Sequence, residues 1–260
     1  MKRNMLIDSH AHLNFPNYDK DRDELINKCL SDNIWVINVG TDYESSKKAI
    51  EISEKYAQGI FASVGMHPES IGKEVFDYKK YKELIVCKKV VAVGEIGLDY
   101  WNHPKTKKKQ FEFKEKQKQL VLEQIKLAKE VELPIIFHCR KAHNDLLEIL
   151  NVKENSNLKG VIHCFTGDWE DAKQYLEMGF YLGFTGIIFK LDLDKVIQNV
   201  PADRMLIETD CPFLSPLADV KRNEPLFVKY MAKKIAELKN ISFEQVVEQT
   251  TKNAKKLFNI

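Results

Sequence analysis

Short apolar runs alternate with longer amphipathic segments along almost the whole chain of 260 residues. The apolar runs have the length of strands, and the segments between them repeat apolar residues at helical spacing. We predict strands at residues 5–7, 34–39, 60–64, 90–93, 134–137, 160–162, 180–182 and 205–207. Eight strand–helix units in series predict a (β/α)8 barrel, a fold for which about 250 residues is a usual length.

The segments between these strands predict helices, and two more helices close the chain. Their expected ranges are 23–32, 45–57, 75–87, 107–131, 142–150, 170–178, 193–200, 224–238 and 242–258. Ser242 and Gln245 form a capping-box pattern at the start of the last helix. Because no linker, repeat or low-complexity tract interrupts the pattern, we expect one domain over residues 1–260. A doubly wound open sheet is the structural alternative.

Polar residues with useful chemistry stand at or just beyond the ends of five predicted strands. In a barrel these ends meet at one mouth, whereas an open sheet would gather its site at a single switch point. The distribution of the residues along the whole chain therefore favours the barrel. The residues concerned are His10, His12, Glu95, His138, His163 and Asp210.

These six residues form a candidate metal site. His10 and His12 are two positions apart, so on an extended strand both side chains point to the same side. Each neutral imidazole offers a nitrogen lone pair to a cation, although hydrogen-bonded surface histidines are the alternative. Four histidines and two carboxylates suffice for two divalent ions, with Glu95 as the natural bridge. Such ligands suit Mg, Mn or Zn.

Composition sets broad limits on the partners and the compartment. The net charge of +2 neither indicates a nucleic-acid-binding protein nor excludes a local basic patch. The five cysteines form no CxxC pair, so we expect free thiols in a reducing compartment. Lys2 and Arg3 precede no apolar leader, and no apolar run is long enough to cross a membrane. We therefore expect a cytoplasmic protein without a membrane partner.

Eight sequence motifs, in order along essentially the whole chain, resemble those of one enzyme family. They are DSHAHL at 8–13, GMHP at 65–68, GEIGLDY at 94–100, LPIIFHCR at 133–140, HCFTG at 163–167, ETDCPFLSP at 208–216, RNEP at 222–225 and NAKKLF at 253–258. The pattern is similar to that of the TatD family of metal-dependent deoxyribonucleases.

This resemblance implies a TIM barrel of the amidohydrolase superfamily with two divalent metal ions. It implies that one ion is held by His10, His12, Glu95 and Asp210, and the other by Glu95, His138 and His163. It also implies a metal-dependent 3′–5′ exodeoxyribonuclease that removes nucleotides from single-stranded or frayed DNA ends.

We assign the following roles within that mechanism. Asp210 accepts the proton of the attacking water, and Glu95 holds the two ions at a fixed distance. The resemblance suggests that His67 contacts the scissile phosphate, with a hydrogen-bonded loop histidine as the alternative. Arg140 follows His138 by two residues, so we expect it to face the mouth and bind phosphate. An ion pair between Arg140 and Glu208 is the alternative.

Further residues near these motifs have two interpretations each. Tyr100 and Trp101 either stack a terminal base or pack the loop. A basic cluster after that loop either contacts the DNA backbone or is a solvated helix start, and it comprises Lys105, Lys107, Lys108 and Lys109. We expect His103 and His143 to be surface residues. We expect Asn223 and Glu224 to shape the loop behind Asp210.

Three other functions are compatible with parts of the pattern. A cyclic amidase or lactonase on the same barrel is disfavoured, because many of these enzymes carry a carboxylated lysine where Glu95 stands. Hydrolysis of D-aminoacyl-tRNA esters would use the same water-activating residues and would make tRNA a partner. A non-catalytic nucleic-acid-binding protein would be favoured by a missing ligand, and none of the six is missing.

Overall fold

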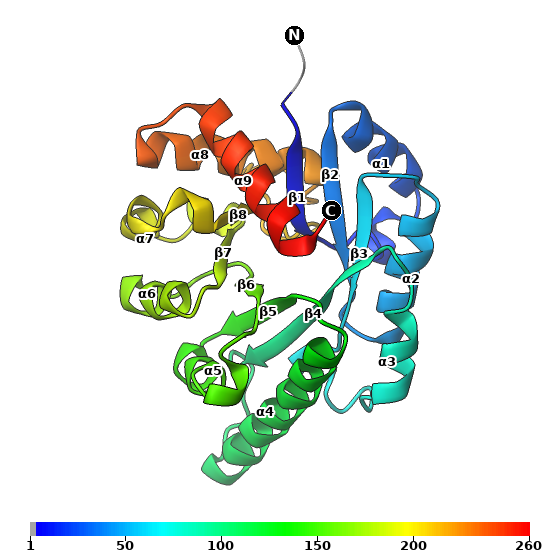
Figure 1. Ribbon diagram of the computed structural model, residues 1–260, viewed down its shortest axis with the longest axis vertical. Coiled ribbons are helices and arrows are strands. Elements are labelled where there is room, and N and C mark those ends of the chain that lie inside the picture. The colour runs from blue at the N-terminus through cyan, green and yellow to red at the C-terminus, as the bar shows by residue number, and fades with distance from the viewer. Residues whose placement is uncertain (1–3) are drawn as a thin grey trace.

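The computed structural model describes residues 4–260, so Lys2 and Arg3 lie outside the described residues. Eight parallel strands form one sheet in chain order and curl into a nearly closed barrel (Figure 1). The (β/α)8 prediction is confirmed. The strands are β1 (Leu6–Ala11), β2 (Ile34–Val39), β3 (Ile60–Val64), β4 (Val90–Asp99), β5 (Ile135–Arg140), β6 (Gly160–Ile162), β7 (Tyr181–Phe184) and β8 (Met205–Ile207).

Helices surround the strands in Figure 1, and every predicted helix is present. The helix predicted at 75–87 is shorter, because the Asp77 side chain caps its first turn at Tyr78. The helix predicted at 224–238 begins at Val228, after a 3-10 turn, η6 (Pro225–Phe227). The helices are α1 (Arg22–Ser31), α2 (Tyr43–Glu54), α3 (Tyr78–Leu84), α4 (Lys107–Glu130), α5 (His143–Leu150), α6 (Trp169–Glu177), α7 (Asp194–Asn199), α8 (Val228–Lys239) and α9 (Phe243–Phe258).

Hydrogen bonds between the first and last strands draw the barrel together. The buried Asp8 carboxylate on β1 accepts from Thr209, just after β8, through the backbone N–H at 2.9 Å and the hydroxyl at 2.6 Å. Beyond them, the Asp210 N–H donates to the His10 carbonyl over 2.9 Å. The N-terminal and C-terminal parts of the chain therefore contribute side by side to one end of the barrel.

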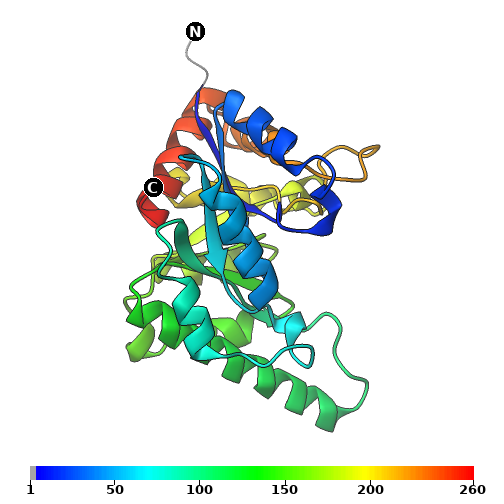
Figure 2. The ribbon, with the colours of Figure 1, turned by 90° about the vertical axis from the view of Figure 1, so that its right-hand side faces the viewer.

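The two ends of the barrel differ in character. Apolar side chains from most of the strands fill the interior, and Ala254, Leu257 and Phe258 of α9 close its N-terminal end. The C-terminal ends of the strands instead open into a cavity of about 1440 Å³. In Figure 2, α4 lies along the lower edge of the molecule, and α9 lies higher, at its left side. Within residues 4–260, no helix has both the length and the apolar composition needed to span a bilayer.

Candidate metal centre

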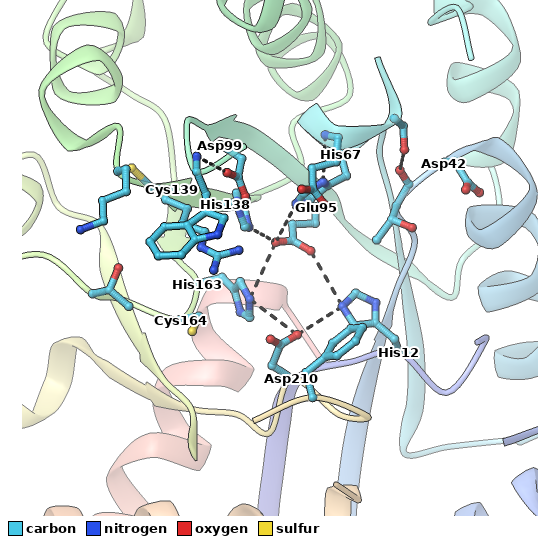
Figure 3. A pocket seen from close by; sticks show the side chains of 18 of the residues that line it. His12, Asp42, His67, Glu95, Asp99, His138, Cys139, His163, Cys164 and Asp210 are labelled. Carbon is cyan, nitrogen blue, oxygen red and sulfur yellow. Dashed lines mark hydrogen bonds and ion pairs between the residues drawn. The ribbon is translucent and has the colours of Figure 1, made fainter. Parts of the chain in front are cut away.

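The six predicted ligands meet at the C-terminal mouth of the barrel, where Figure 3 shows five of them labelled around one pocket. The first strand brings two of them there through an irregularity. Asp8 pairs with Val36 and Ala11 with Asn38, so β1 contains one residue more than β2 over this stretch. Such a bulge changes which side chains face inward. It turns His10 toward the site, whereas Ala11 packs into the outer core.

Four ligand atoms surround one point beside β1. The Nε2 atoms of His10 and His12 lie 3.2 Å apart, and Glu95 Oε2 lies 3.4 Å and 3.9 Å from them. Asp210 Oδ1 completes the group at 3.8 Å from His10 Nε2 and 3.3 Å from His12 Nε2. Tetrahedral ligands about 2.1 Å from a cation are separated by roughly 3.4 Å. These four residues therefore fit a divalent metal ion.

The second oxygen of Glu95 faces a different set of rings. Glu95 Oε1 lies 2.7 Å from His138 Nδ1 and 3.8 Å from His163 Nε2. His163 Nε2 is also 3.8 Å from Asp210 Oδ1. The two carboxylate oxygens of Glu95 thus point to two groups of nitrogen atoms, which is the arrangement that a bridging ligand requires.

Hydrogen bonds at the far ring nitrogens separate the histidines into two kinds. His12 Nδ1 donates to the Val39 carbonyl over 2.9 Å, and His163 Nδ1 lies 2.8 Å from Glu208 Oε1. When either ring is neutral, its proton therefore sits on Nδ1 and the Nε2 lone pair faces the site. His138 is held in the opposite sense, because its Nε2 lies 2.9 Å from Asp99 Oδ2 and its Nδ1 faces Glu95.

His67 has the reverse polarity. It follows β3 and caps η2 (Pro68–Ser70), where its Nδ1 accepts from the backbone N–H of Glu69 over 3.1 Å. The proton of the neutral ring must then be on Nε2, which points toward Glu95 Oε1 at 3.8 Å. Burial and the neighbouring His138 lower the pKa of His67 to about 3, so the ring is neutral at pH 7. His67 therefore presents an N–H donor to the cavity, whereas His12, His138 and His163 are held at their far nitrogens and turn the other ring nitrogen toward Glu95 and Asp210.

The carboxylates are kept ionised in spite of their burial. Desolvation alone would raise the pKa of Glu95, but the neighbouring His10 and His163 hold that pKa well below its usual value. Asp210 behaves similarly, since burial is outweighed by the hydrogen bond from His12 and the charge of His163, and its pKa is lowered. For His138, burial is outweighed by hydrogen bonds to Asp99 and Glu95, which raise its pKa to about 10.

Of the two predicted substrate contacts Arg140 and Tyr100, only Arg140 lines the cavity. Arg140 reaches the cavity, but its guanidinium lies 4.4 Å from the centre of the Trp101 ring. The alternative pairing with Glu208 is wrong, because Glu208 is fully buried and accepts from Cys164 N–H and Ser9 Oγ. Tyr100 cannot stack a base, since it is 5% exposed and its hydroxyl donates to Asp145 over 2.7 Å.

The remaining expectations concern the rim and the loop behind the site. His103 is exposed as predicted, but His143 is half-buried against the Tyr175 hydroxyl, so its assignment to the surface was wrong.

Asn223 donates to the carbonyls of Thr209 and Phe213, on either side of Asp210, as expected for a residue that shapes this loop. The four lysines of the basic cluster are exposed around the start of α4 and outside the lining of the cavity.

Asp99 and Glu208 are the residues that the sequence analysis missed. Each is a carboxylate that holds the far nitrogen of a candidate ligand, His138 and His163 respectively. Spacing offered a signal: Asp99 stands four residues after Glu95 and Glu208 two before Asp210, which are same-side positions on an extended chain.

The sequence is similar to known proteins along almost its whole length. A family model described as TatD related DNase matches residues 7–259. The chain belongs to the TatD family. A metal-dependent hydrolase of Bacillus subtilis, YabD, is 43% identical over 98% of this chain and 100% of its own length. The family resemblance is thereby confirmed, and the chain is a metal-dependent hydrolase.

Two further TatD relatives extend the comparison to a named activity and to a solved structure. A protein of Cronobacter sakazakii named 3′-5′ ssDNA/RNA exonuclease TatD is 30% identical over 97% of both chains. The crystal structure of the TatD homologue YjjV of Escherichia coli superposes with a TM-score of 0.88 and is 28% identical over 98% of both chains. The TatD barrel is therefore shared along its full length.

Proposed function

We propose that this TatD-family hydrolase is a 3′–5′ exonuclease that cleaves phosphodiester bonds at single-stranded or frayed DNA ends. The observation that carries the proposal is the sorting of the histidines. Acceptors at the far nitrogens of His12, His138 and His163 leave the other nitrogen of each ring facing Glu95 and free for a cation once the ring is deprotonated, while His67 directs an N–H donor into the same cavity. A site that binds cations and also a phosphate oxygen needs both kinds of ring.

Two divalent cations, Mg, Mn or Zn, would be held by the residues described above. His10, His12, Glu95 and Asp210 would hold one, and Glu95, His138 and His163 the other. When bound, such ions supply Lewis-acid activation of water and neutralise the charge of the phosphate. Glu95 would contribute to both positions, because its two oxygens face different histidines and its side chain is only 4% exposed.

The side chains then divide the work of hydrolysis. Asp210 is ionised, lines the cavity and accepts the proton of the attacking water. His67 donates its Nε2 proton in a hydrogen bond to a non-bridging phosphate oxygen. Arg140, at the edge of the cavity, adds a fixed positive charge for the same phosphate or its neighbour.

The relative named as an ssDNA/RNA exonuclease supports a nucleic-acid substrate with an accessible single strand. The free cysteines support a reducing, cytoplasmic location. Hydrolysis of D-aminoacyl-tRNA esters would use the same proton acceptor, and this second candidate is separated from the first by assay.

The test uses protein stripped of metal and reloaded with Mg, Mn or Zn. Single-stranded DNA, RNA and a D-aminoacyl-tRNA are offered side by side, and we expect shortening of DNA from its 3′ end. Asp210→Asn should lower turnover by about 10²–10⁴-fold while DNA binding persists. Asp203→Asn, an exposed carboxylate just before β8, is the matched control and should keep full activity.

Two results would contradict the proposal at different levels. Wild-type turnover in Asp210→Asn would refute only the role of that carboxylate as proton acceptor. A fully metal-loaded protein that leaves every nucleic acid intact but cleaves the aminoacyl ester would replace the exonuclease by the deacylase.

A further inference from the structure

An aromatic ring stands exposed on the wall of the cavity beside the metal centre. Trp101 follows β4 by two residues, lines the cavity and is 53% exposed. Its backbone N–H donates to Asp99 Oδ1 over 2.8 Å, and the other oxygen of Asp99 holds His138. The backbone that carries the ring is therefore fixed by the same carboxylate that orients a candidate metal ligand.

Cationic groups lie against this ring. The Arg140 guanidinium carbon is 4.4 Å, and Lys141 Nζ 5.9 Å, from the centre of the Trp101 ring. Trp101 and Arg140 are neighbours because β4 and β5 pair at this point. Asp99 pairs with Arg140, and the N–H of Tyr100 donates to the Arg140 carbonyl. A guanidinium stacked on an indole occupies one face. Because Trp101 lines the cavity and is 53% exposed, part of its ring remains accessible beside these cations.

The same wall is the cationic side of a largely acidic cavity. The loops after β2 and β3 and the first turns of α2 and α3 line the cavity with five carboxylates against two lysines, Lys73 and Lys80; the carboxylates belong to Asp42, Glu44, Glu69, Glu74 and Asp77. Asp168 and Asp171 add further negative charge after β6. Between these two walls stand Arg140 and Lys141, at the end of β5. A polyanion that approaches the metal centre meets favourable charge on this side.

We propose that Trp101 and Arg140 form a nucleotide subsite at the ends of β4 and β5. A nucleobase adjoining the scissile phosphate stacks on the open part of the Trp101 ring, and its phosphate pairs with Arg140. This inference rests on the proposed function and adds the path of the substrate strand across the mouth. Because every base has a stacking face, the subsite selects for single-stranded nucleic acid without selecting among bases.

Steady-state kinetics on hexathymidylate test the subsite. Stacking of one base on an aromatic side chain corresponds to about 5- to 150-fold in binding, so Trp101→Ala should raise KM by a factor in this range. The value of kcat should change little, because the ring does not touch the reacting atoms. Trp101→Phe should restore most of the affinity. Phe111→Ala, an exposed aromatic on α4 outside the cavity lining, should behave as wild type.

A double-mutant cycle between protein and substrate identifies the stacked base. An abasic site is placed at each of the first three positions in turn. At one position, removal of the base should raise the KM of the wild-type protein by the same factor as Trp101→Ala does on the intact substrate. At that position, removal of the base should not raise the KM of the Trp101→Ala variant any further. Independent losses at every position would overturn the proposal. Binding should also quench tryptophan fluorescence in the wild type and not in Trp101→Phe.

Salt dependence tests the phosphate contact of Arg140. Arg140→Ala should lower the slope of log affinity against log salt by about 0.7, the value for one contact in a single strand. Lys195→Ala, an exposed lysine on α7, is the control for the loss of one charge. If wild-type protein cleaves DNA but Trp101→Ala matches it, the subsite alone is wrong. If no oligonucleotide is bound or cleaved with any of the three cations, the proposed function fails as well.

Discussion

Replacement of Asn223 by alanine should reduce the activity of the site beyond its effect on the barrel. Asn223 is completely buried behind the loop that carries Asp210. Its Nδ2 donates to the carbonyls of Thr209 and Phe213 over 2.8 and 2.6 Å, and its Oδ1 accepts from the Glu224 N–H over 2.9 Å. The side chain therefore ties together the residues before and after Asp210.

Asn253 offers a matched control at the opposite end of β8. Its Nδ2 donates to the carbonyls of Ala202 and Met205, each over 2.8 Å, and its Oδ1 accepts from Gln249 over 2.8 Å. Each side chain thus makes three hydrogen bonds, and a hydrogen bond contributes about 1 kcal/mol net. Both alanine variants should therefore lose about 2–3 kcal/mol of unfolding free energy. Their effects on catalysis should differ, because Asn253 lies away from the mouth.

Urea unfolding would measure the stability of both variants, and kcat would be measured at 25 °C on the folded protein. Displacement of a catalytic group by about 1 Å costs on the order of 100-fold, so we expect Asn223→Ala to lose about 10- to 100-fold in kcat. Asn253→Ala should stay within about twofold of wild type, as expected for a residue at the end of a barrel that serves stability. Equal losses of kcat in the two variants, or wild-type kcat in Asn223→Ala, would refute this reasoning.

Two other substitutions test how β4 and its neighbour build the site. Gly97 has a φ of +148°, and an added Cβ would lie 2.0 Å from the His138 carbonyl oxygen, so Gly97→Ala should destabilise the fold by more than about 3 kcal/mol in urea unfolding. Gly179→Ala has a similar backbone constraint, at a φ of +90°, but open space around it, and should cost only about 1–2 kcal/mol. Asp99→Asn should weaken metal binding about 10- to 100-fold in calorimetric titration, because an amide cannot accept from both Trp101 N–H and His138. Asp145→Asn, which removes a carboxylate bound to Tyr100 and Lys118 instead, should leave metal affinity unchanged.

The barrel could be predicted because its strands are buried on both faces and read as continuous apolar runs. The strands predicted at 160–162 and 205–207 agree fully with β6 and β8. The fourth strand was predicted to end at Val93, but β4 continues to Asp99. Its last part carries Glu95 and Asp99 among apolar residues, so the functional side chains interrupt the hydrophobic pattern while the backbone pairing continues.

The members of the candidate site could be predicted, but the orientation of their rings could not. The proton of each imidazole is placed by a partner that is distant in sequence, such as Asp99, which is 39 residues from His138. The bulge in β1 is likewise set by pairing with β2 and leaves no mark in the motif itself. Burial decided the fate of Tyr100 and His143, and burial depends on how α5 and α6 pack against the barrel.

The buried carboxyl groups at the mouth should make this end of the barrel sensitive to substitution. Asp8 accepts three hydrogen bonds, two of them from Thr209, and Glu208 is held by Ser9, Cys164 and His163. Each hydrogen bond offsets part of the desolvation cost of a buried ionisable group. Loss of one donor therefore leaves a buried acceptor without a partner, and the full desolvation cost of that acceptor remains. The apolar side chains of α9 that close the other end of the barrel need no such partners, since hydrophobic contacts are non-directional. Substitutions at the mouth should therefore disturb the chemistry even where the barrel survives, whereas substitutions beneath α9 should act through the stability of the barrel alone.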